Sequence, residues 1–157
     1  MPADHDPDTL AFLVNRLAIS DLVHAYCQGV DRRDPEAVAR LFTEDGTFVA
    51  YAQPGANEPT SRSHGREAIT KAIAMARYYK RTTHTVGNHM AVVDGDRATG
   101  ETRVVAYHVL GDAGAETLMI WHIRYLDAYV RNTEGWRINE RVLRVDMVSK
   151  QPLNGTY

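Results

Sequence analysis

The chain has 157 residues, of which 44% are hydrophobic and 24% are charged, and this composition predicts one globular domain, residues 1–157, and excludes a disordered chain. Lys and Arg (18) nearly balance Asp and Glu (20), so the formal charge of −2 gives no support for a nucleic-acid partner. No apolar run reaches the roughly 20 residues of a membrane span, and the acidic start lacks the apolar segment of a signal peptide. We therefore expect no membrane partner and a cytoplasmic location.

Amphipathic stripes predict helices in the first half of the chain. The first stripe ends at Leu17 and a second begins at Ile19, so a kink or a new helix is expected near Ala18, and Asp8 is a candidate cap for the first segment. Asp34 followed by Pro35 predicts a short helix from Pro35 to about Phe42. The remaining expectations are a strand at 47–52, a loop at 53–64 and a third helix at roughly 66–79.

Strands are expected from Thr82 onward. Two hairpins are predicted, one joining 82–93 to 98–110 and one joining 117–131 to 136–148, with turns at 94–97 and 132–135. Long successive strands favour an antiparallel sheet over βαβ units. Gly87 inside the first long strand predicts a bulge that bends the sheet. The fold class is thus α+β, with N-terminal helices packed on a curved antiparallel sheet that encloses a pocket.

Asp31 is the first candidate for chemistry. It follows the second stripe, near the C-terminal end of a predicted helix, where the macrodipole disfavours a carboxylate. Burial in an apolar pocket would raise its pKa further. The alternative is a solvated aspartate that pairs with Arg32 or Arg33. The residues alone leave both interpretations open.

His84 and His108 are candidates for acid–base work. His84 lies early in a predicted strand, where an imidazole facing a pocket can act as a general base. Simple pairing places Tyr107 opposite His84, but a bulge residue at 87–88 would bring His108 onto the His84 face. The alternatives are a surface or core His84 and an outward His108.

Metal binding and nucleophilic catalysis have less support. His84 and His89 would point to opposite faces of a regular strand, although His108 and His122 keep a metal open. The single Cys27 excludes an internal disulfide and has no local catalytic signature. No glycine-rich phosphate loop is present, so we expect no metal, nucleotide or flavin cofactor.

Two further features concern the last hairpin. Arg141 could meet an anionic ligand, but a structural ion pair with a residue such as Asp127 is favoured. Tyr125, Asp127 and Tyr129 alternate along one strand face and could belong to the core, an interface or the pocket. Trp121 is interpreted as a packing residue.

Several runs resemble the SnoaL-like group of the nuclear transport factor 2-like superfamily. These are AISDLVHAYCQGVDRRDPEAVARLFTEDGTF, THTVGN, VVDGDRATGET and YLDAYVRNTEGWRINER, which together cover about residues 10–148. The resemblance implies a cone-shaped α+β barrel. Among catalytic members it is nearest to scytalone dehydratase, bile-acid 7α-dehydratase and hexachlorocyclohexane dehydrochlorinase. The fold hosts many activities, so it does not itself fix the reaction.

The resemblance also implies site residues. GVDRRD places Asp31 at the family's aspartate and THTVGN places His84 at its histidine, which implies a His–Asp general-base dyad. Tyr26, Asn88 or His108 would bind a carbonyl oxygen or protonate a leaving hydroxyl. Val30 stands where scytalone dehydratase has tyrosine, so scytalone itself is not the expected substrate.

The expected function is a cofactor-independent lyase of the dehydratase type. Its substrate would be a hydrophobic small molecule with hydroxyl or carbonyl groups, such as a steroid, terpenoid or polyketide. An isomerase or polyketide cyclase with the same dyad remains open, as does a non-catalytic module like a dioxygenase small subunit. We also expect a homo-oligomer, because long edge strands with aromatics such as Tyr125 and Tyr129 need cover from a partner. The resemblance to the eliminating enzymes implies a trimer in preference to a dimer.

Overall fold

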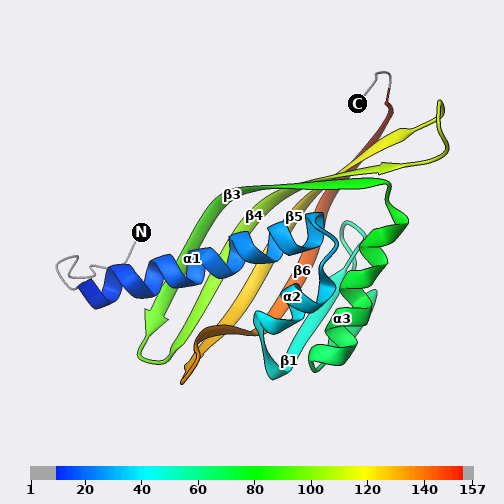
Figure 1. The fold of residues 1–157 in the computed structure, drawn as a ribbon. Helices are drawn as coiled ribbons and strands as arrows, with labels where there is room; N and C mark the ends of the chain where they lie inside the picture. The colour runs from blue at the N-terminus through cyan, green and yellow to red at the C-terminus, as the bar shows by residue number, and fades with distance from the viewer. Residues whose placement is uncertain (1–9, 154–157) are drawn as a thin grey trace.

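The computed structural model describes residues 10–153, which form a single curved sheet with helices packed on one face (Figure 1). Asp8, the candidate helix cap, lies outside the described residues. The elements in chain order are α1 (Leu10–Asp31), α2 (Pro35–Arg40), β1 (Phe42–Tyr51), β2 (Ser61–His64), α3 (Arg66–Ala74), the 3₁₀ helix η1 (Met75–Tyr78), β3 (Arg81–Asp94), β4 (Arg97–Leu110), β5 (Thr117–Asn132) and β6 (Gly135–Pro152).

The sheet has six strands in the order β2-β1-β6-β5-β4-β3. The pairs β3–β4, β4–β5 and β5–β6 are antiparallel, as expected, and β2 also pairs antiparallel with β1. β1 runs parallel to β6, the last strand in the chain, so the sheet is mixed. The predicted loop at 53–64 ends in the short edge strand β2, which adds to β1.

Helix α1 is continuous, so the kink expected near Ala18 is wrong. The change of phase marks a change of environment: the second stripe is buried on the sheet, whereas Leu13 and Leu17 of the first stripe are exposed. Helix α2 begins as predicted, with the Asp34 carboxylate accepting a hydrogen bond from the Ala37 N–H at 2.9 Å. The helix predicted at 66–79 ends at Ala74 and continues as η1.

By length and composition alone, α1 could cross a membrane, with a mean hydropathy of 1.2 over its most apolar window. Its C-terminal half, however, forms part of the core of the α+β domain. The buried residues are Ile19, Leu22, Val23, Tyr26, Cys27, Gly29 and Val30. A core helix passes the same composition test, so α1 is no argument for a membrane span.

A bulge in β3 sets which side chains face the helices. The register against β4 shifts between Val86 and His89, so His84 pairs with Ala106 instead of Tyr107. Because Ala106 is fully buried, this register brings His84 and His108 onto the inner face of the sheet. The predicted bulge and its effect on His108 are confirmed.

Candidate functional site

Asp31 is the last residue of α1 and lies against the start of β3. Its Oδ1 is 2.7 Å from Nδ1 of His84 and accepts a hydrogen bond from the Thr82 hydroxyl at 2.9 Å. Its Oδ2 accepts the backbone N–H of His84 at 2.8 Å. One carboxylate therefore holds both the ring and the backbone of His84. β3 is an edge strand, and Asp31 satisfies an N–H that faces away from the sheet.

These contacts favour an ionised Asp31. Burial raises the pKa of the carboxyl, but the hydrogen bonds from the His84 ring, the His84 backbone and Thr82 outweigh it, so the pKa is lowered. A carboxylate on Nδ1 fixes the tautomer with the proton on that nitrogen. The other ring nitrogen, Nε2, is then free to accept a proton.

His108 lies beside His84, with their ring centroids 6.1 Å apart. It is flanked by Tyr79 at 4.3 Å and by Trp121 at 5.0 Å, also between ring centroids. Burial lowers the pKa of His108 to about 4, and the charge of His84 acts in the same direction. His108 is therefore a neutral imidazole at pH 7.

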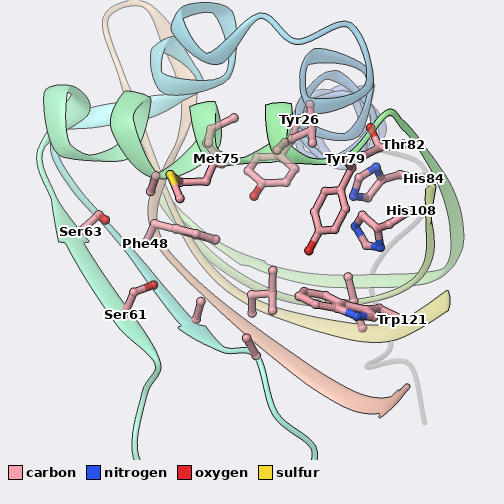
Figure 2. Close-up of a pocket in the computed structure, with 18 of the residues that line it drawn as sticks. Tyr26, Phe48, Ser61, Ser63, Met75, Tyr79, Thr82, His84, His108 and Trp121 are labelled. Carbon is pink, nitrogen blue, oxygen red and sulfur yellow. The ribbon is translucent and has the colours of Figure 1, made fainter. Parts of the chain in front are cut away.

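These side chains line one end of a cavity of about 700 Å³, within the range typical of small-molecule sites (Figure 2). Figure 2 shows Tyr79, His84, His108 and Trp121 grouped together, with the Tyr79 ring between the histidines and the rest of the space. The other walls are mostly apolar. They include Val30, Phe48, Ala50, Ala72, Ile73, Met75, Ala76, Ile123 and Leu143.

The remaining site candidates divide between the cavity and the surface. Tyr26 lines the cavity and is 2% exposed. Burial raises the pKa of its hydroxyl, which stays protonated. Asn88 lies at the bulge, is exposed, and is not among the residues that line the cavity. Burial raises the pKa of Cys27 to about 11, so it is a thiol rather than a thiolate nucleophile.

Arg141 forms the expected structural pair with Asp127. Its Nε and Nη2 donate to the two carboxylate oxygens at 2.8 and 2.7 Å, and both side chains are fully buried. Tyr125 and Tyr129 are each 1% exposed and belong to the core. They lie on β5, between β4 and β6, so the expectation that they lie on edge strands is wrong.

Tyr79, Thr82 and Trp121 belong to the site but were not predicted there. Thr82 had a signal, because residues two apart on a strand share a face and His84 was already a candidate. The sequence predicts a packing role for Trp121, and Trp121 both packs on His108 and lines the cavity. Tyr79 lies between η1 and β3, where no periodic pattern fixes the direction of a side chain.

The histidines do not form a metal site among residues 10–153, where no group of three or more His, Cys, Asp or Glu is placed to bind an ion. His84 and His89 share the inner side of β3, because the bulge reverses the parity of a regular strand. His89 instead contacts Thr102, with 2.9 Å between Nδ1 and the hydroxyl oxygen.

A family model described as a SnoaL-like domain matches residues 12–142. The chain belongs to this family. An uncharacterized protein of Mycobacterium tuberculosis is 27% identical over 135 residues, or 85% of this chain and 87% of that one. Our protein thus shares its family fold with chains whose roles are open, and the fold alone does not fix the reaction.

Several solved structures are also similar to the chain. A protein of Novosphingobium aromaticivorans provisionally assigned as a scytalone dehydratase is 26% identical, with a TM-score of 0.74 and 88% of each chain covered. Another from that organism, provisionally assigned as an aromatic ring hydroxylase, is 25% identical, with a TM-score of 0.74 over 88% of this chain and 94% of that one. Hexachlorocyclohexane dehydrochlorinase of Novosphingobium barchaimii, at 20% identity and TM-score 0.73 over 94% and 96%, shares the fold.

Proposed function

We propose that this SnoaL-like protein is a cofactor-independent lyase that removes water from a hydrophobic hydroxylated or carbonyl-containing small molecule. The observation that carries the proposal is the Asp31–His84 pair at the end of the apolar cavity, with 2.7 Å between Oδ1 and Nδ1. Structural neighbours whose names indicate a dehydratase and a dehydrochlorinase, both eliminating activities, add support.

In the proposed reaction, Nε2 of His84 takes a proton from a carbon beside a carbonyl or from an activated ring carbon. The C–H electron pair forms a new double bond, the C–O bond of the neighbouring hydroxyl breaks, and that hydroxyl leaves as water after gaining a proton. Asp31 stabilises the imidazolium formed on His84. General acid–base steps of this type contribute roughly 10²–10⁴-fold each.

Two side chains beside His84 can act on the leaving hydroxyl. His108 is neutral at pH 7 and its ring already hydrogen-bonds the Met119 backbone, so it is suited to orient the leaving hydroxyl and not to protonate it. Tyr79 presents a phenol whose pKa burial raises, so it stays protonated. Both rings stand beside His84 in Figure 2, whereas Asn88 is exposed and does not line the cavity. We assign the donor role to Tyr79, with His108 orienting the leaving hydroxyl, and give Asn88 no part in the step.

The same dyad could isomerise or cyclise a substrate without loss of water, since both reactions begin with the same proton transfer. A non-catalytic module is less well supported. A binding module needs no carboxylate that orients a histidine. An Asp31–His84 pair exposed on the surface would have been consistent with such a module. Here the side chain of His84 is 5% exposed and lines the cavity.

The test starts with a thermal-shift screen of hydroxylated steroids, terpenoids and polyketide aromatics, followed by mass spectrometry of the compounds that bind. We expect a product that has lost one water, and we expect His84→Ala and Asp31→Asn each to abolish most turnover with little change in melting temperature. His24→Ala is the matched control, because His24 is an exposed histidine on α1 whose Nδ1 lies 2.8 Å from the Ser20 carbonyl oxygen of the same helix. An unchanged rate in His84→Ala would overturn the proposal, and a product of unchanged mass would replace elimination with isomerisation or cyclisation.

A further inference from the structure

Helix α1 ends in a backbone conformation that an arginine rarely adopts. Arg33 has φ +58°, in the left-handed region. The Arg33 N–H bonds the Val30 carbonyl at 3.1 Å and the Asp34 N–H bonds the Gly29 carbonyl at 2.9 Å. This is a Schellman ending, and the position that Arg33 occupies usually holds glycine, which has no Cβ to clash there.

The side chain of Arg33 supplies a reason for arginine at this position. Its Nη1 donates to the carbonyl of Ala76 at 3.1 Å, and its Nη2 donates to the carbonyls of Tyr79 and Lys80 at 2.5 and 2.9 Å. One guanidinium therefore ties the end of α1 to the link between η1 and β3. A planar fork of donors suits several carbonyls at once, which a lysine ammonium cannot match in the same geometry.

The segment that Arg33 holds contains much of the site. Tyr79 lies against His108, and Thr82 and His84, which bond Asp31, follow within four residues of Lys80. Asp31 lies on the α1 side of these contacts, two residues before Arg33. The Arg33 contacts and the Asp31–His84 contacts thus span the same junction between α1 and β3.

We propose that Arg33 is a positioning residue that holds the start of β3 against Asp31 and thereby sets the geometry of the Asp31–His84 pair. The importance of Arg33 for catalysis rests on the proposed function, but its effect on the geometry of the Asp31–His84 pair does not. Left-handed backbone costs a non-glycine residue stability, and such strain persists where the surroundings enforce it, commonly at functional sites. The sequence suggested Arg33 as an ion-pair partner of Asp31; the structure directs its guanidinium to backbone carbonyls instead.

The test compares Arg33→Ala and Arg33→Gly in the full chain. Both remove the guanidinium, but glycine also relieves the backbone strain, so Arg33→Gly should melt about 3 °C above Arg33→Ala. In both variants alike, the pKa of Asp31, followed by carbon NMR of its carboxyl, should rise toward the ordinary value because its hydrogen bonds loosen. Exchange of the His84 amide proton should become roughly two- to tenfold faster.

Arg32→Ala is the control, since it removes an equal charge from the exposed neighbouring position. It should leave the Asp31 titration and the His84 amide unchanged. Three results would overturn the proposal: no change in either Arg33 variant, an equal change in Arg32→Ala, or changes that follow melting temperature instead of loss of the guanidinium. These measurements need no substrate, so they decide the role of Arg33 even if the protein catalyses no elimination reaction. If the Asp31–His84 pair is intact but the protein shows no activity, the result counts only against the proposed function.

Discussion

Replacing Asp127 with asparagine should destabilise the protein strongly, because it leaves the charge of Arg141 buried without a counter-charge. Both side chains are fully buried, and Nη1 of Arg141 has no hydrogen-bond partner among residues 10–153, so Asp127 is the group that compensates the guanidinium. The Tyr129 hydroxyl also donates to Asp127 at 2.7 Å. The Arg141 guanidinium carbon lies 4.1 and 4.2 Å from the ring centroids of Tyr26 and Tyr125, both of which line the cavity.

Breaking a buried pair from one side costs about 3–5 kcal/mol. For a chain of this size that corresponds to a fall in melting temperature of roughly 10 °C. Calorimetry or urea unfolding measures it. Asp146→Asn is the comparison, because Asp146 pairs with Arg103 and Arg124 at partly exposed positions and should lose less than about 1 kcal/mol.

The double variant Asp127→Leu, Arg141→Met distinguishes the cost of an uncompensated charge from the cost of losing the ion pair itself. Replacing both charges with apolar groups removes the uncompensated charge, so most of the stability lost in Asp127→Asn should return. If Asp127→Asn cost no more than Asp146→Asn, the reasoning would fail. It would also fail if the double variant were no more stable than Asp127→Asn.

The pKa of His108 is lowered to about 4, below its unfolded value of 6.5, so the unfolded chain binds its proton first as pH falls. Stability should therefore decline from about pH 6.5 to pH 4, by at most about 3 kcal/mol, and urea unfolding of His108→Gln should show a flatter pH profile. Gly29→Ala should cost about 1–2 kcal/mol, since the added Cβ would lie 2.5 Å from Cγ2 of Val38; chemical denaturation that finds it neutral would contradict this packing. We also expect a homo-oligomer, a trimer in preference to a dimer, so light scattering should give a multiple of 17.6 kDa. Leu13→Glu, on the exposed stripe of α1, should lower this mass, and a wild-type mass of 17.6 kDa would refute the oligomer.

Much of the fold is predictable because local patterns and short connections determine it. The strands from Arg81 onward differ from expectation by a residue or two at most ends, since alternation and two tight turns fix their register. The parallel pairing of β1 with β6 was not predictable. It joins segments about 90 residues apart, and neither segment's own pattern identifies its partner.

The site shows the same division. Asp31 and His84 were found through their resemblance to a family pattern, because residues 53 positions apart carry no local sign that they bond. Trp121 was assigned to packing because an aromatic residue inside a strand looks the same whether it faces core or cavity. The role of Arg33 was hidden for another reason: the left-handed backbone and the three carbonyls that it contacts are properties of the folded chain.

The bulge in β3 connects these observations, because the inner face of the strand depends on it. Gly87 lies where an added Cβ would be 3.3 Å from the Arg103 carbonyl oxygen, a close approach that favours glycine. The bulge changes which face of the sheet each side chain of the preceding part of β3 takes, so His84, which pairs with Ala106, points inward. Asp31 then bonds both the ring and the backbone N–H of His84. Without the extra residue, His84 would pair with Tyr107 and turn its ring outward. The Asp31–His84 pair thus requires one irregular position in a regular strand, three residues from the histidine that it directs.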